Sequence, residues 1–132
     1  MPPGSTLFLL FNHRFTLAQE DAARSRLGVA KIIALPPDLR QLWAQIPPDL
    51  PALSHHLEPL RRWLAGQARP GDYVLIQGDF GATYLMVRFT LSQNLIPIYA
   101  TTRREAVEEH QPDGSVKMVH RFQHQGFRRY GE

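Results

Sequence analysis

The sequence contains no cysteine, so a disulfide framework and a thiolate metal site are both excluded. It has no long block of lysine or arginine of the kind that wraps long nucleic acid, and its formal net charge is only +3. The early apolar run from Leu7 to Phe11 is far too short for a signal peptide or a membrane span. These absences favour a cytoplasmic protein with neither a membrane nor a long nucleic acid as partner. A small anionic ligand fits the mild charge, although a solvated surface rich in arginine explains it too.

With 132 residues, of which 43% are hydrophobic, the chain is long enough to bury one core and too short for two independent domains. A single domain over residues 1–132 is therefore expected. Buried strands are predicted at four short apolar runs, residues 6–11, 30–35, 72–77 and 95–100.

Helix signals lie between these runs. Thr16 and Gln19 have the spacing of a capping box, which predicts a helix that ends at Gly28. Leucines at 53, 57, 60 and 64 share one helical face, with Arg61 and Arg62 turned away and with Pro59 expected to kink or divide the helix. Asp38 and Asp49 are candidate N-caps in the segment before that helix. Apolar spacing predicts a further helix over residues 82–92.

This alternation of strands and helices predicts an α/β fold, a Rossmann-like open parallel sheet with helices on both faces. The expected strand order is two-one-three-four, with the order reversing between strands one and three. Residues 104–132 differ in character, because residues 105–109 and 116–122 flank a turn. They predict a C-terminal β-hairpin arm with Lys117, Val119 and Arg121 as its basic side, acting as a flap or in dimer formation.

Three polar segments follow predicted strands, at residues 12–14, 78–83 and 101–104. Because ligands of such sheets bind outside the carboxyl ends of the strands, these segments are expected to converge on one crevice. Gly78 and Gly81 permit close approach of the backbone, and the helix start near Ala82 is a ready anion site. The alternative is that Asp79 only caps the helix and that the glycines only make the turn.

Two residues are candidates for chemistry at this crevice. Arg103 follows a buried strand, where its guanidinium could bind a phosphate. His13, at the end of the first strand, could transfer a proton near neutral pH, or could be purely structural. His110, His120 and His124 match no standard set of metal ligands, so neither a metal nor another cofactor is expected.

The sequence resembles the small stand-alone CRISPR-associated Rossmann-fold (CARF) proteins of type III CRISPR systems over nearly the whole chain. The resemblance rests on residues 8–13, 74–84, 97–103 and 113–117. It implies a homodimer that binds a cyclic oligoadenylate second messenger, expected to be cyclic tetra-adenylate, across the two-fold axis. It also implies a ring nuclease that needs no metal and leaves a cyclic 2′,3′-phosphate, and that thereby ends antiviral signalling.

On this resemblance Arg103 would stabilise charge and His13 would transfer a proton or orient the sugar. The residues expected to contact the ligand are Asn12, Gln77, Gly78, Asp79, Phe80, Gly81, Thr83 and Thr102. Two alternatives remain open. One is a non-catalytic sensor or sponge that uses the same pocket, and the other is a structural subunit whose glycine-rich turn binds nothing.

Overall fold

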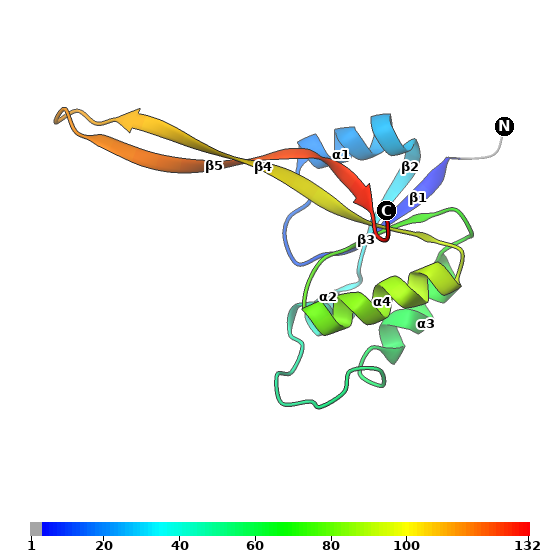
Figure 1. Cartoon of the computed structure of the whole chain (residues 1–132). Helices are drawn as coiled ribbons and strands as arrows, with labels where there is room; N and C mark the ends of the chain where they lie inside the picture. The colour runs from blue at the N-terminus through cyan, green and yellow to red at the C-terminus, as the bar shows by residue number, and fades with distance from the viewer. Residues whose placement is uncertain (1–3) are drawn as a thin grey trace.

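The computed structural model describes residues 4–132, which form one five-stranded sheet with helices on both faces (Figure 1). The strands are β1 (Ser5–Leu10), β2 (Val29–Ala34), β3 (Tyr73–Ile76), β4 (Ile96–His110) and β5 (Val116–Arg129). The helices are α1 (Leu17–Ala22), which continues as the π-helical turn η1 (Ala23–Leu27), α2 (Pro37–Ala44), α3 (Glu58–Gln67) and α4 (Phe80–Ser92).

The sheet has the order β2-β1-β3-β4-β5. The first four strands are parallel, and β5 pairs with β4 in the antiparallel sense. The predicted α/β class and the predicted order of the four parallel strands are therefore confirmed. The last strand makes the sheet mixed.

Alternate residues of the central strands supply two cores, one on each face of the sheet. Phe8 and Ile76 pack with Trp43 of α2 on the face covered by α2, α3 and α4. Leu7 and Leu75 pack with Ala23 on the face covered by α1 and η1. Since the Trp43 side chain is only 1% exposed, this tryptophan belongs to the core and not to a subunit interface.

The first helix begins and ends as the sequence predicts. The Gln19 N–H donates to the Thr16 hydroxyl at 3.2 Å, and the Gln19 side chain accepts from the Thr16 N–H at 2.9 Å, which completes the capping box. Gly28 ends η1 in the left-handed conformation, at a φ of 69° that suits glycine.

The segment between β2 and β3 departs from the prediction. The N-cap of α2 is Pro36, so Asp38 lies in the first turn, and no helix begins at Asp49. Helix α3 starts at Glu58, which places Pro59 in its first turn instead of at a kink, a position where the missing proline N–H does no harm.

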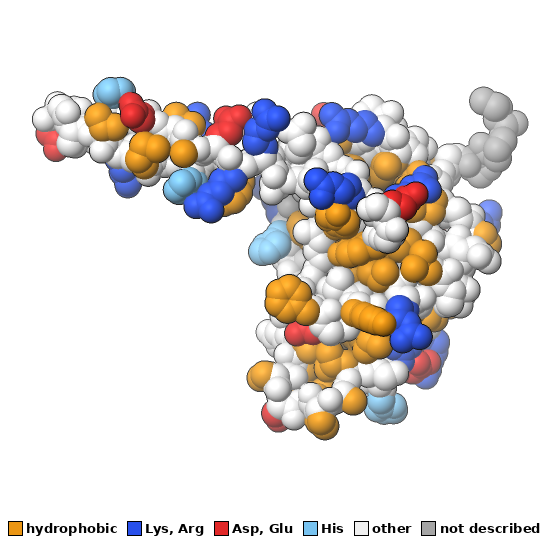
Figure 2. All heavy atoms as spheres, viewed as in Figure 1, with side chains coloured by type: hydrophobic (Ala, Val, Ile, Leu, Met, Phe, Trp, Pro, Cys, Tyr) orange, Lys and Arg blue, Asp and Glu red, His pale blue; other side chains and the backbone are white. Residues whose placement is uncertain are grey.

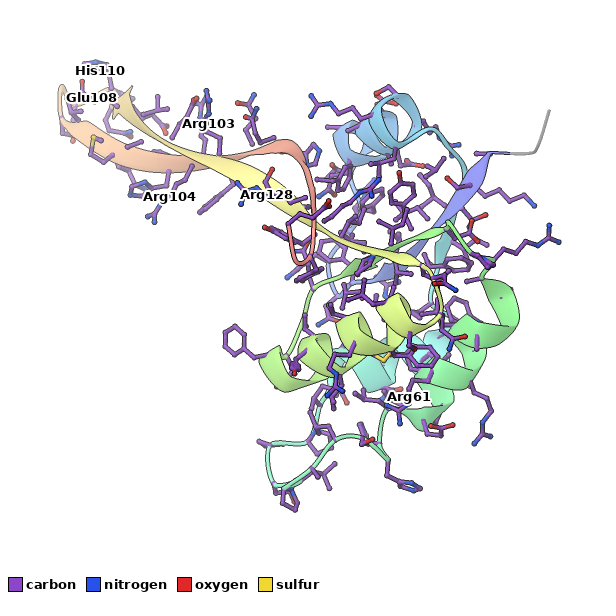
Figure 3. All side chains as sticks on the ribbon, turned by 45° about the vertical axis from the view of Figure 1, so that its right-hand side comes forward. Arg61, Arg103, Arg104, Glu108, His110 and Arg128 are labelled. Atoms are coloured by element: carbon purple, nitrogen blue, oxygen red, sulfur yellow. The ribbon has the colours of Figure 1, made fainter. Side chains whose placement is uncertain are left out.

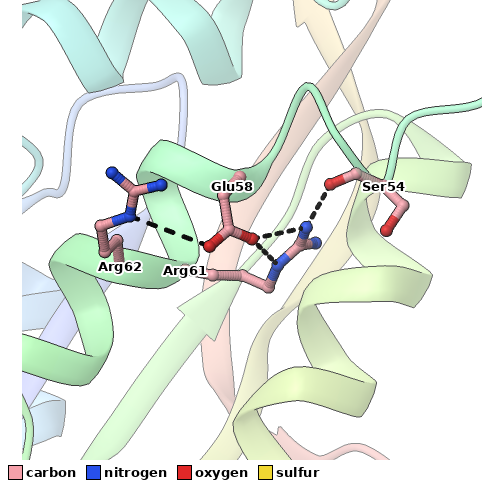
Figure 4. Close-up of polar contacts among 4 residues, drawn as sticks. All are labelled: Ser54, Glu58, Arg61 and Arg62. Atoms are coloured by element: carbon pink, nitrogen blue, oxygen red, sulfur yellow. Dashed lines mark hydrogen bonds and ion pairs between the residues drawn. The ribbon is translucent and has the colours of Figure 1, made fainter.

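Arg61 is not turned away as expected; only Arg62 is. The Arg61 side chain is 17% exposed and donates to the Glu58 carboxylate, with N–O distances of 3.1 and 3.2 Å (Figure 4). It also donates to the Ser54 carbonyl, so it fastens the preceding loop to α3. Arg62 reaches the other Glu58 oxygen at 3.8 Å from the helix surface.

The largest departure concerns β4, which does not end at residues 101–104. It continues to His110 as one strand, and its outer half pairs with β5 to form a two-stranded arm that projects from the body (Figure 1). A register shift between Thr101 and Thr102 marks the point where the ribbon leaves the body, so we define the arm as residues 102–124. Beyond it, Gly126 to Arg129 pair with Ile98 to Thr101 as the edge of the sheet.

Candidate functional site

The turn between β3 and α4 is fastened to three other elements through one residue, Gln77. Its N–H donates to the Leu10 carbonyl at the end of β1 at 3.0 Å, and its side-chain oxygen accepts from the Ala100 N–H of β4 at 2.7 Å. Its carbonyl accepts from the Trp43 indole N–H at 3.0 Å. Gln77 therefore sets the position of the turn that follows it.

Asp79 and Gly78 both have structural tasks in this turn. The Asp79 carboxylate caps α4 by accepting from the Ala82 N–H at 3.0 Å, so the predicted capping role of Asp79 is confirmed. A Cβ atom at Gly78 would lie 2.9 Å from the Trp43 indole nitrogen. Gly78 thus permits a close approach, as predicted, and the approaching group in the structure is the indole.

A shallow hollow of about 430 Å³ opens beside the turn, and we call it the α4 hollow. It is lined by Gln77, Gly78, Phe80, Thr83, Tyr99 and Tyr130. Four of these six residues were predicted to contact a ligand. The Phe80 side chain is 94% exposed, and the Thr83 hydroxyl is buried with no hydrogen-bond partner among the described residues.

Sequence reasoning missed the aromatic wall of this hollow. Tyr99 of β4 and Tyr130, just after β5, lie with ring centroids 4.8 Å apart. The Tyr130 hydroxyl donates to the Ile76 carbonyl at the end of β3. Burial, and then the neighbouring Tyr99, raise the pKa of Tyr130 above its usual 10.0, which keeps this donor protonated. Because side chains alternate along a strand, the sequence could have placed Tyr99 on the face of the sheet opposite to that of the buried Ile98. Only the fold brings Tyr130, which follows β5, next to Tyr99.

The arginine that contacts a lining residue of this hollow is Arg128, not Arg103. The Arg128 guanidinium lies 5.8 Å from the centre of the Tyr99 ring and donates to the Tyr99 hydroxyl at 3.3 Å. The Arg103 side chain is 62% exposed on the arm and lies 4.0 Å from Glu105 (Figure 3). Thr102 also belongs to the arm, opposite His124. The predicted convergence of residues 101–104 with the turn is therefore wrong, because β4 does not end there.

His13 lies in a second hollow of about 380 Å³, which we call the β1–β2 hollow. Its lining residues are Leu9, Phe11, His13, Arg14, Phe15, Ala34, Leu35 and Arg40. The two hollows share no lining residue, so His13 and the α4 turn line separate hollows of the chain. Asn12 is exposed and is not among the residues that line either hollow.

The histidines of the arm do not assemble around a common point. Within residues 4–132, no three His, Asp or Glu side chains are grouped so that they could hold a metal ion. The His124 ring lies at the root of the arm, 5.0 Å from the Phe127 ring, and neither of its nitrogens has a partner in the described structure. Burial, and then the charge of Arg26, lower the pKa of His124 below its usual 6.5.

Comparison with known proteins shows to which family the chain belongs. The family model described as "Uncharacterized protein MJ1673 family" matches residues 5–128. The chain belongs to this family. It is 48% identical over 124 residues to the Methanocaldococcus jannaschii protein named "Uncharacterized protein MJ1673", a match that covers 94% of this chain and 95% of that one. No solved structure matches the chain.

The family match bears on the architecture of the molecule. The matched residues 5–128 include the whole arm, every residue that lines the β1–β2 hollow and five of the six residues that line the α4 hollow, whereas Tyr130 lies beyond them. Among residues 4–132, no helix is both long and apolar enough to cross a membrane.

Proposed function

We propose that this protein is a CARF-like, Rossmann-type protein that binds a cyclic oligoadenylate at the α4 hollow and cleaves the ring without a metal. The observation that carries the proposal is the pairing, in one hollow, of a helix start with an exposed aromatic ring, that of Phe80. Such a ligand consists of phosphates and adenines. The first turn of α4 offers backbone N–H groups to a phosphate, and Phe80 offers a ring on which a base can stack.

The polar groups of the hollow support the same ligand class. The Thr83 hydroxyl is buried without a partner in the described structure and can donate to a phosphate or ribose oxygen. Arg128, held over Tyr99, adds a positive charge to the same wall. Since Asp79 is engaged in capping, we assign it no contact with phosphorus.

Cleavage of the ring requires one internal displacement. A ribose 2′-oxygen attacks the adjacent phosphorus, the bond to the 5′-oxygen breaks, and the product is linear with a cyclic 2′,3′-phosphate. A base takes the 2′-hydroxyl proton and an acid supplies a proton to the 5′-oxygen. His13 is the candidate for proton transfer and Arg103 for charge stabilisation, with the two halves of a homodimer facing a two-fold symmetric ring.

A specific observation favours the second candidate, a non-catalytic sensor or sponge. His13 lines a different hollow from the α4 turn, and Arg103 lies out on the arm. Among the described residues, neither a histidine nor an arginine thus lines the α4 hollow of a single chain.

The test is to incubate the protein with cyclic tetra-adenylate in excess EDTA and to resolve the products by chromatography and mass spectrometry. Linear adenylates ending in a cyclic 2′,3′-phosphate support the ring nuclease, and loss of cleavage with retained binding in His13→Ala or Arg103→Ala assigns the role. Intact ring with tight binding supports the sensor or sponge. Absence of binding overturns both and leaves a structural subunit.

Phe80→Ala locates the site. Because the Phe80 side chain is exposed, its removal leaves the fold intact, and loss of one stacked base, worth ~1–3 kcal/mol, weakens binding by about tenfold or more. Leu17→Ala is the matched control, since Leu17 is also an exposed apolar residue, 75% accessible, and starts α1 on the other face of the sheet. Unchanged affinity in Phe80→Ala would show that the α4 hollow is not the site.

A further inference from the structure

The strand register gives the arm two faces of different character. Residues that face each other across an antiparallel pair share a face. One face carries the pairs Arg104–Phe122, Ala106–His120 and Glu108–Met118, and we call it the apolar face. The Arg104 guanidinium, 5.8 Å from the centre of the Phe122 ring, confirms this assignment.

The opposite face carries charges of both signs at facing positions. It pairs Glu105 with Arg121 and Glu109 with Lys117, so each cation of the predicted basic side faces a carboxylate across the ribbon. Opposite charges directly across a strand pair stabilise the ribbon. Arg103 and Glu105 of this face also lie 4.0 Å apart as an ion pair within the chain.

The apolar face has no cover within the chain. Val116, Met118 and Phe122 are 50%, 55% and 68% exposed, and no residue from 101 to 125 is buried. Figure 2 shows the arm standing clear of the body, with hydrophobic side chains along it. A two-stranded ribbon is at best marginally stable in water, and a second layer on its apolar face would stabilise it.

The apolar face carries one positive and one negative side chain, Arg104 and Glu108, in an order that allows it to pair with the same face of a second copy. Arg104 and Glu108 lie on β4 on either side of Ala106. A two-fold axis that lies just above the apolar face and runs across the ribbon over Ala106 and His120 stacks a second arm on the first in the reverse direction. Arg104 then faces Glu108 of the second copy, twice over, and Phe122 faces the second copy's Met118.

We propose that the arms of two copies of this chain pack through their apolar faces in this antiparallel arrangement. Within one chain, Arg104 and Glu108 are about 13 Å apart, because a strand rises ~3.4 Å per residue. In the described part of the chain neither forms an ion pair. The ribbon twists between the two residues (Figure 3), so the two arms wrap around each other. This pairing does not depend on the proposed ligand.

The test uses charge reversals and sedimentation velocity over a range of protein concentrations. The intact chain is expected to dimerise. Arg104→Glu places carboxylates opposite each other, and Glu108→Arg places guanidinium groups opposite each other. Each single variant should therefore raise the dimer dissociation constant by about tenfold or more, because like charges in contact are strongly unfavourable.

The contact should be restored in two ways, by combining both changes in one chain and by mixing the two single variants. The double variant Arg104→Glu, Glu108→Arg should dimerise like the unmodified chain. An equimolar mixture of the two single variants should form heterodimers, since every facing pair is again of opposite sign. Lys31→Glu is the control of equal charge change, on β2 at the far edge of the sheet, and should leave dimerisation unchanged.

Three results would overturn the proposal. They are a monomeric unmodified chain at all concentrations, single reversals that dimerise as before, and a mixture of the two single variants that stays monomeric. The mixture guards against a folding artefact, because two misfolded proteins would not regain association by being combined. Circular dichroism of each single variant confirms that the sheet is retained.

Discussion

Strand β4 is covered on both faces in the body and exposed on both faces in the arm. Ile98 is 1% exposed and packs in the core on the α1 side, whereas residues 102–106 are all exposed. The hydrogen-bonded pairing with β5 continues from one region into the other. In β4, the change from apolar to polar sequence therefore marks the end of burial and not the end of the strand.

The two regions are also stabilised differently. The body holds two packed cores, in which side chains from distant parts of the chain meet. The arm has cross-strand pairs alone, each of which contributes only a few tenths of a kcal/mol to about 1 kcal/mol. Substitutions should therefore have large effects in the body and small ones in the arm.

The largest difference in the free energy of unfolding is expected between Trp43→Ala in the body and Phe122→Ala in the arm. Trp43 fills the core beneath the α4 turn, so its truncation should lower the free energy of unfolding by about 3–5 kcal/mol. Phe122→Ala should change it by no more than ~0.5 kcal/mol at low protein concentration. Urea unfolding measures both, and equal losses would contradict the division into body and arm.

Gly78→Ala tests the close contact behind the α4 hollow. The added methyl group meets the Trp43 indole at 2.9 to 3.0 Å, so overpacking should destabilise the fold by about 1–3 kcal/mol. Gly66→Ala is the matched control. Apart from its chain neighbours and the backbone of its own helix, no atom lies within 4 Å of a Cβ there, and in the last turn of α3 alanine should stabilise by at most about 0.5–1 kcal/mol. Thermal unfolding should shift in opposite directions for the two variants.

Tyr130→Phe probes the point where the chain returns from the arm to the body. Without the hydroxyl the Ile76 carbonyl loses its donor, and the fold should lose about 1–3 kcal/mol. Because the folded-state pKa of Tyr130 is raised, stability is lost as the pH rises above about 10, where the unfolded chain ionises first. Denaturation between pH 8 and 11 should show a smaller alkaline loss in the variant. If the variant and the unmodified chain show the same pH dependence, Tyr130 is not the source of the alkaline loss of stability.

The smallest effect is expected at the root of the arm, from His124. Its pKa is lowered in the folded state, so the unfolded chain takes up the proton first, and stability falls as the pH drops below about 6.5. His124→Phe keeps an aromatic ring beside Phe127 and cannot titrate. Between pH 5 and 7 its unfolding midpoint in urea should vary less than that of the unmodified chain. Equal slopes would show that His124 does not contribute.

Local and periodic features were predictable from the sequence. The capping box at Thr16 and Gln19 and the stop at Gly28 depend on neighbouring residues and formed as predicted. The order of the parallel strands follows from the crossover rules, and it also placed the α4 turn at a carboxyl end of the sheet. Residues 78–83 were thus identified as the candidate site, and three of them line the α4 hollow, together with Gln77, which only the family resemblance had named.

Only the tertiary structure decided what surrounds that turn. The Trp43 indole leaves no room for a side chain at position 78, which explains why that residue is glycine. Tyr130, which follows both strands of the arm in the sequence, completes the lining of the hollow. His13 and the α4 turn follow strands that are neighbours in the sheet, yet they line separate hollows. Sequence patterns report which residues are buried and which end an element. They do not report which side of the sheet a distant segment will cover, because that depends on the packing of the whole chain.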